Sequence, residues 1–98
     1  MIGYRFLSVA EEEMILAAQF YDGERSGLGS RFLEEIYSAI DRICRFSEIG
    51  TPISNRLRSV VLYRFPYSLI YYIDVDTIVV TVVAHQSRRP NYWKDRIS

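Results

Sequence analysis

The spacing of the apolar residues changes halfway along the chain, and this change restricts the possible folds more than any other feature. Apolar side chains recur at helical spacing as far as Cys44, whereas from Leu57 onward they alternate or run together. Recurrence near 3.6 residues is typical of helices that bury one face, and alternation or a β-branched run is typical of strands. The sequence therefore predicts an α+β domain, with its helices first and most of its sheet last.

The first half predicts a short strand at residues 4–8, followed by two helices. Ser8–Glu11 matches a capping box, in which the serine and glutamate side chains bind backbone amides at the start of a helix. This helix should end near Asp22, and a second should begin near Leu28 and bury a face that continues to Cys44. Because the link between them is short, we expect an antiparallel helical hairpin.

The second half predicts three strands, at residues 57–65, 68–73 and 78–83, which are joined by short turns. Links of this kind produce an antiparallel meander, and the β-branched run 78–83 is typical of a central strand that is buried on both faces. A short terminal helix is predicted within residues 91–96. The expected architecture is a single domain over residues 1–98, β-α-α-β-β-β, with the helical hairpin packed on one face of an antiparallel sheet.

The formal net charge is zero, but the two halves of the chain differ. Residues 1–53 hold five arginines against nine acids, and residues 54–98 hold six arginines and one lysine against three acids. Arginine presents a planar fork of donors that matches phosphate or carboxylate. The balance changes from −4 to +4, so we expect the second half to bind an anion or an acidic partner, with ordinary surface charge as the alternative.

The cysteine content and the hydropathy pattern exclude several classes of protein. Cys44 is the only cysteine, which excludes an internal disulfide or a cysteine metal cluster, and we expect this thiol to be a small core residue. The N-terminus lacks the pattern of a signal peptide, and no apolar stretch approaches the ~20 residues that a membrane span needs. We therefore expect a cytoplasmic protein without membrane contact, cofactor or metal.

Four segments, which occur in a fixed order, carry a resemblance to a known family. They are Gly27–Leu33 at the start of the second helix, Arg64–Tyr67, the strand Ile78–Ala84, and His85–Trp93. Together with the order of the elements they cover nearly the whole chain, which resembles the RelE/ParE superfamily of toxins (the plasmid stabilisation protein family). The resemblance implies the toxin of a type II toxin–antitoxin system, which forms a hetero-oligomer with a small cognate antitoxin.

The resemblance leaves two functions open, because RelE-like members cleave mRNA on the ribosome and ParE-like members inhibit DNA gyrase. Metal-independent RNA cleavage requires a base, an acid and cations for the phosphate. His85 is the candidate base and Tyr92 the candidate proton donor, and Arg64 and Arg89 are the candidate phosphate ligands. Each also has a structural interpretation: His85 and Tyr92 in packing, and Arg64 in an ion pair with an acid of the hairpin.

A surface that only binds a partner needs fewer roles, and the arginines of the second half fit it. The candidate residues for binding a target or the antitoxin are Arg56, Arg58, Arg64, Arg88, Arg89 and Trp93. The ring of Trp93 either stacks on a partner or pins the end of the chain onto the sheet. The apolar groove beside the helical hairpin is a second candidate contact for the antitoxin.

Two departures from the nuclease pattern favour the ParE-like function. RelE-like nucleases commonly carry lysines on the sheet, whereas Lys94 is the only lysine in this chain. Other nuclease branches use a glutamate as base, and no acid occurs between Gly50 and Ile73. We therefore expect a ParE-like toxin that binds DNA gyrase. A ribosome-dependent mRNA endoribonuclease is the alternative, and a homologue without toxicity is a third possibility.

Overall fold

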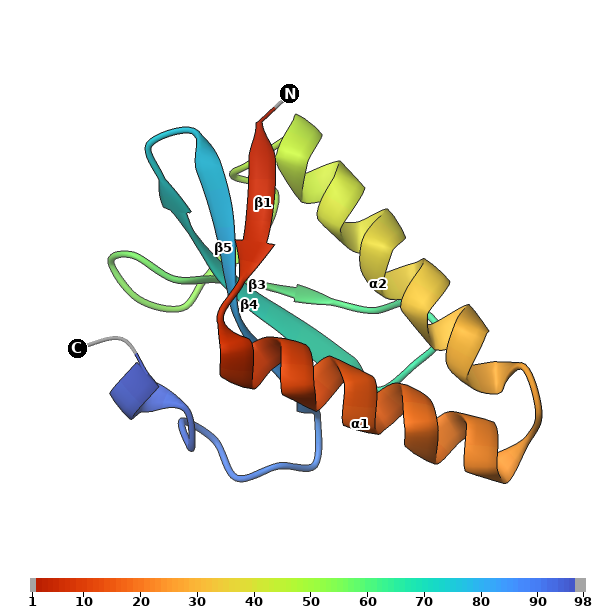
Figure 1. The fold of residues 1–98 in the computed structure, drawn as a ribbon. Coiled ribbons are helices and arrows are strands. Elements are labelled where there is room, and N and C mark those ends of the chain that lie inside the picture. Colours follow the sequence, from red (N-terminus) through yellow and green to blue (C-terminus); the bar gives the residue numbers. More distant parts are fainter. Residues whose placement is uncertain (1, 97–98) are drawn as a thin grey trace.

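The computed structural model describes residues 2–96 and arranges them as two helices on a five-stranded sheet (Figure 1). The predicted α+β order is confirmed, with one two-residue strand added before the last three strands. The elements are β1 Gly3–Phe6, α1 Ser8–Glu24, α2 Leu28–Arg45, β2 Thr51–Pro52, β3 Arg58–Val61, β4 Tyr67–Asp74, β5 Thr77–His85 and the 3-10 helix η1 Lys94–Arg96. Residues 1, 97 and 98 of the predicted domain lie outside the described part of the chain.

The sheet has the strand order β1-β5-β4-β3-β2. The antiparallel meander of β3, β4 and β5 is confirmed. β2 pairs antiparallel with β3, but β1 pairs parallel with β5. Gly3 lies opposite Thr77, and Phe6 lies opposite Val80. The sheet is therefore mixed rather than wholly antiparallel. Both helices separate β1 from the other strands in sequence, and so long a connection allows neighbouring strands to run in the same direction.

The main core lies between the sheet and the helical hairpin, which covers one face of the sheet (Figure 1). The prediction of a central buried strand is confirmed, because residues 78–83 of β5 are all 2% exposed or less. Opposite them, α2 contributes the fully buried side chains of Phe32, Ile36 and Ile43. Burial of one large apolar side chain contributes about 1.5–3 kcal/mol, so this layer supplies much of the stability of the domain.

The two helices meet at Gly29, where the packing leaves no room for a side chain. A Cβ atom at this position would stand too close to the carbonyl oxygen of Ala18 for any ordinary contact. The N–H of Gly29 donates to Oδ1 of Asp22 at 2.8 Å, which ties the start of α2 to the end of α1. The predicted helical hairpin is therefore fixed by backbone contact as well as by apolar burial.

The capping box predicted at Ser8–Glu11 was wrong. Leu7 occupies the cap position of α1, and no side chain caps it. The N–H of Leu7 donates to the carbonyl oxygen of Val80 in β5, while its own carbonyl accepts from amides of the first helical turn. Because β1 leads directly into α1, Ser8 already lies inside the helix and comes too late to cap it.

The strand predicted at residues 57–65 was too long. β3 ends at Val61, because Leu62 and Phe65 are both buried in the helix-side core, with 4% and 9% of their surface exposed. Two residues that are three positions apart in a strand would point to opposite faces. Residues 62–66 therefore form a loop between β3 and β4. Only the last three residues of the predicted terminal helix are helical, as η1.

Candidate functional site

The sheet face away from the helices carries a second, smaller apolar cluster. Leu57, Ile70 and Val82 form this cluster, and the rings of Tyr92 and Trp93 pack against it from the end of the chain. A groove of about 300 Å³ lies beside it, between the start of β3 and residues 84–93. We call the surface around this cluster and groove the arginine face, and define it by Arg56, His85, Arg88, Arg89 and Trp93.

Two guanidinium groups of the arginine face lie over tyrosine rings. The guanidinium carbon of Arg56 is 4.1 Å from the ring centre of Tyr72, and that of Arg88 is 3.9 Å from the ring centre of Tyr92. An exposed contact of this kind contributes about 0.5–1 kcal/mol and holds the side chain in place. Within residues 2–96, neither arginine forms an ion pair with a carboxylate. Their donor groups therefore remain available to an anion or to an acidic partner.

His85, the last residue of β5, is held by its own turn. Its Nδ1 accepts the backbone N–H of Ser87 at 3.0 Å and lies 2.7 Å from the hydroxyl oxygen of the same serine. The imidazole also packs edge-on against Tyr67, with ring centres 5.1 Å apart. Since a backbone N–H can only donate, the neutral ring carries its proton on Nε2. His85 lines the groove and contributes a polar side chain to it.

Tyr92 is bound to an acid that the sequence analysis missed. Its hydroxyl donates to Oε2 of Glu13 in α1 at 2.6 Å, and the guanidinium of Arg96 donates to both oxygens of the same carboxylate at 2.9 and 2.8 Å. The N–H of Val83 in β5 donates to Oε1 at 3.0 Å. Arg96 also donates to the carbonyl oxygen of Thr81. We call Glu13, Tyr92 and Arg96 the latch, because they tie the end of the chain to α1 and β5.

The latch changes the acidity of its members. Burial alone would raise the pKa of Glu13, but the hydrogen bonds from Arg96, Tyr92 and Val83, together with the charge of Arg96, lower this pKa below its ordinary value. Burial and the hydrogen bond to Glu13 raise the pKa of Tyr92 to about 12. A phenol with this pKa keeps its proton at neutral pH, and its proton is already donated to Glu13.

A sequence signal for Glu13 was present. Glu13 lies three residues after Ala10 and four before Ala17, and both alanines are buried on the inner face of α1. Residues at these spacings share one side of a helix. Glu13 is the last of three consecutive glutamates, and this spacing alone places its side chain on the side of α1 that faces the sheet.

The other two predicted arginines lie elsewhere. The Nη1 atom of Arg58 donates to the carbonyl oxygens of Glu48 and Gly50, at 2.9 and 2.8 Å. These hydrogen bonds hold the backbone that leads into β2. Arg64 lies in the β3–β4 loop and lines a cavity on the helix side of the molecule. None of the other candidate catalytic residues lines that cavity, so the structure does not bring Arg64 together with His85, Arg89 and Tyr92.

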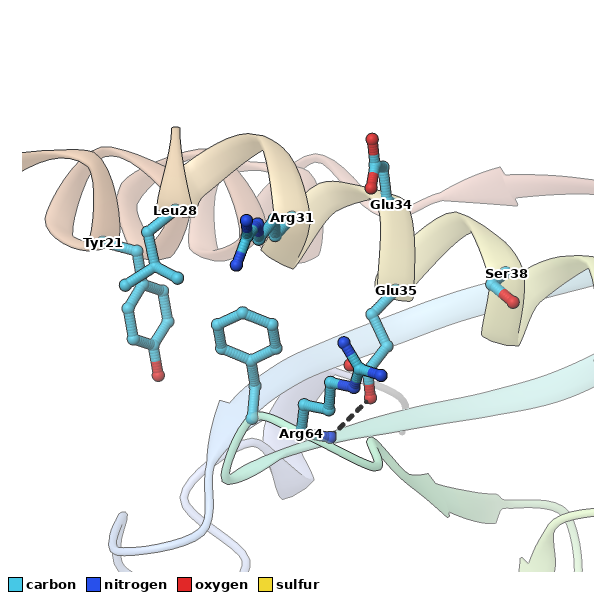
Figure 2. Close-up of a pocket in the computed structure, with 8 residues that line it drawn as sticks. Tyr21, Leu28, Arg31, Glu34, Glu35, Ser38 and Arg64 are labelled. Atoms are coloured by element: carbon cyan, nitrogen blue, oxygen red, sulfur yellow. Dashed lines mark hydrogen bonds between the residues drawn. The ribbon is translucent and has the colours of Figure 1, made fainter. Parts of the chain in front are cut away.

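The cavity beside Arg64 has a volume of about 620 Å³ and lies between the helical hairpin and the β3–β4 loop (Figure 2). We call it the hairpin cavity. The residues that line it are Tyr21, Leu28, Arg31, Glu34, Glu35, Ser38, Arg64 and Phe65. The predicted ion pair of the Arg64 side chain is absent within residues 2–96; instead its backbone N–H donates to Oε2 of Glu35 at 2.9 Å.

No helix within residues 2–96 is long and apolar enough to cross a membrane. The same part of the chain has no group of three or more His, Cys, Asp or Glu side chains placed to hold a metal ion.

Comparisons with known proteins identify a family by sequence and a shared fold by structure. The family model described as the ParE toxin of the type II toxin–antitoxin system parDE matches residues 4–90. No curated protein matches the sequence. A solved structure titled as the chromosomal ParDE TA system from P. aeruginosa is similar to this chain, with a TM-score of 0.63 and 11% identity over 87% of this chain and 96% of that one. The isolated E. coli RelE toxin is similar as well, with a TM-score of 0.68 and 18% identity over 97% and 95% of the two chains.

Proposed function

The chain belongs to the ParE toxin family of type II toxin–antitoxin systems, and we propose that it arrests growth by binding DNA gyrase through the arginine face. A cognate antitoxin neutralises the toxin in a hetero-oligomeric complex, and the toxin acts in the cytoplasm, where its target is found.

One observation carries the choice of binding over catalysis. Arg56 and Arg88 are held over tyrosine rings, are exposed, and have no carboxylate partner within residues 2–96. Arg89 and Trp93 line the groove next to Arg88. Arginine and tryptophan are the residues most often responsible for affinity at protein interfaces. Such an array suits an acidic protein surface without any transfer of protons.

The alternative, cleavage of mRNA, has less support from the geometry. A metal-independent nuclease needs an acid that gives its proton to the leaving oxygen. The proton of Tyr92 is donated to Glu13, and the pKa of this phenol is about 12. Arg64 lines the hairpin cavity rather than the groove, so a nuclease site here would consist of His85 and the arginines of the groove alone.

A supercoiling assay with purified DNA gyrase tests the proposal. We expect the wild-type toxin to inhibit supercoiling, and an Arg88→Ala/Arg89→Ala variant to inhibit it at least tenfold more weakly. An Arg5→Ala/Arg42→Ala variant removes two exposed arginines outside the arginine face and should inhibit like the wild type. Cleavage of ribosome-bound mRNA by the wild type, lost in His85→Ala, with supercoiling unaffected, would reverse the assignment in favour of the nuclease.

A further inference from the structure

The last residue of β5, His85, opens a turn that fixes its imidazole ring. The N–H of Arg88 donates to the carbonyl oxygen of His85 at 3.0 Å, which closes a β-turn. The N–H of Gln86 donates to the carbonyl oxygen of Pro66 at 2.8 Å, so the turn is attached to the loop before β4. Tyr67, which pairs with His85 in the sheet, also holds the ring edge-on. Backbone and ring contacts therefore set the position of the imidazole before any partner binds.

Only one ring nitrogen of His85 remains for a partner. Nδ1 accepts the backbone N–H of Ser87 at 3.0 Å, and the hydroxyl oxygen of this serine lies 2.7 Å from the same nitrogen. A neutral imidazole has one donor and one acceptor nitrogen, so the proton lies on Nε2. Nε2 has no hydrogen-bond partner among residues 2–96. His85 thus offers a partner a donor and no lone pair.

This arrangement of the ring suits binding better than catalysis. A general base must point a lone pair at the proton that it removes. The only lone pair of the neutral ring that can accept a proton is on Nδ1, and it is directed at the N–H of Ser87. Protonation of Nδ1 would therefore break a contact that fixes the ring, whereas donation from Nε2 leaves every contact of the turn in place.

The groove beside His85 favours an anionic acceptor. Arg88 and Arg89 line the groove together with His85, and none of the described residues that line it is acidic. The guanidinium of Arg88 is already held over the ring of Tyr92. Hydrogen bonds to an ionised acceptor are shorter and roughly twice as strong as those between neutral groups. A carboxylate therefore suits this set of donors best.

We propose that His85 binds the target as a neutral hydrogen-bond donor, with its Nε2–H directed at a carboxylate that Arg88 also contacts. The inference deepens the proposed function and rests on it, because the carboxylate belongs to an acidic residue on the surface of the target. The arginines attract any anion, whereas the Nε2–H requires an acceptor at one position, so His85 contributes specificity.

Substitutions that keep or remove one ring nitrogen test the proposal in the gyrase supercoiling assay. The side-chain amide of His85→Gln extends about as far as Nε2 and still donates, whereas the shorter amide of His85→Asn takes the place of Nδ1. We expect His85→Gln to inhibit within about threefold of the wild type, and His85→Asn and His85→Ala to inhibit at least about tenfold more weakly. Gln19→Ala truncates an exposed polar side chain of α1 and should inhibit like the wild type.

The imidazole of the wild type can also be observed directly, because His85 is the only histidine. In the neutral form, its nitrogen-15 NMR spectrum should show a protonated Nε2 and an unprotonated Nδ1. A neutral ring with its proton on Nδ1, or an even mixture of the two tautomers, would overturn the inference without the use of any variant.

The outcomes for folded variants, checked by circular dichroism, separate this inference from the proposed function. Equal loss of gyrase inhibition in His85→Gln and His85→Ala would overturn the inference, and so would full inhibition by His85→Ala; in both cases gyrase would remain the target. A wild type that leaves gyrase unaffected would remove the proposed target, and growth arrest in cells then compares the same variants. Arrest by the wild type and His85→Gln, but not by His85→Ala, would still support the donor, and any other pattern of arrest would overturn it.

Discussion

The helix-side core and the C-terminal segment, residues 86–96, are attached to the sheet in different ways. The core is a continuous apolar layer in which side chains such as Ile36 and Val80 are fully buried. Within the described residues, the N–H of Gln86 donates to the carbonyl oxygen of Pro66, and the later backbone hydrogen bonds of the segment stay local. Beyond residue 86 the segment is therefore held by side chains, namely the latch and the rings of Tyr92 and Trp93.

This difference distinguishes the arginine face from the hairpin cavity. The hairpin cavity is built on the strongly packed helices, so its shape should persist as long as the domain is folded. Arg88, Arg89 and Trp93 of the arginine face lie on the C-terminal segment, whose attachment depends on a few polar contacts. Regions with few buried contacts open locally at lower free energy than the core. Residues 86–96, which carry Arg88, Arg89 and Trp93, should therefore open locally while the hairpin cavity keeps its shape.

The largest expected effect comes from a truncation in the core. Ile36→Ala should lower the free energy of unfolding by about 2–5 kcal/mol, because a cavity replaces a fully buried side chain. Global unfolding, measured by urea denaturation, should remove both the arginine face and the hairpin cavity in one transition. The control is Ile15→Ala, since Ile15 is 46% exposed and its truncation should cost far less. An effect of Ile36→Ala no larger than that of the control would contradict the picture of a dominant core.

A smaller change tests the hairpin alone. Gly29→Ala forces a methyl group against the carbonyl oxygen of Ala18, and we expect a loss of about 1–3 kcal/mol from the resulting shift of the helices. Gly23→Ala in α1 is the matched control, because its Cβ would meet nothing within 4 Å. That substitution should stabilise the helix by about 0.5–1 kcal/mol. Thermal unfolding of the two variants should therefore shift in opposite directions, and shifts of the same sign would contradict the close packing at Gly29.

Features set by local periodicity could be predicted from the sequence. The buried strand of residues 78–83 is a β-branched run, and the inner face of α2 repeats at helical spacing, so both follow from neighbours in the chain. The parallel pairing of β1 could not be predicted in this way, because it joins residues more than 70 positions apart. The end of β3 depends likewise on Leu62 and Phe65 finding the helix-side core.

In the candidate site, too, local features could be predicted and contacts between distant residues could not. All the predicted site residues between His85 and Trp93 line one groove. Arg64 lines a different cavity, and the partner of Tyr92 is Glu13, 79 positions away. Side-chain contacts over such separations depend on how the elements pack, which composition and spacing do not specify.

A change in the latch should loosen the C-terminal segment without unfolding the core. Glu13→Gln keeps the size of the side chain but removes the charge that holds Arg96, at a cost of about 1–2 kcal/mol in local stability. Hydrogen exchange at the amides of Val83 and of residues 92–96 should become about tenfold faster, while the urea midpoint changes little. Glu12→Gln alters an exposed neighbour and should leave both measurements unchanged. A large fall in the urea midpoint of Glu13→Gln would show that the latch belongs to the core.

The smallest effect, and the most specific, is the dependence of the latch on pH. Because the pKa of Glu13 is lowered in the folded chain, its contribution is complete above the ordinary value of 4.5 and is lost as the pH falls through the lowered pKa. The raised pKa of Tyr92 acts in the opposite direction: its contribution is complete below the ordinary value of 10 and is lost as the pH rises toward about 12.

After correction for the intrinsic effect of pH on exchange, the amides of residues 92–96 should therefore be protected at neutral pH and lose protection below pH 4.5. Glu13→Gln should show no acid loss, and Tyr92→Phe should keep the acid loss but not the alkaline one. Equal acid profiles for the wild type and Glu13→Gln would mean that another group holds the segment.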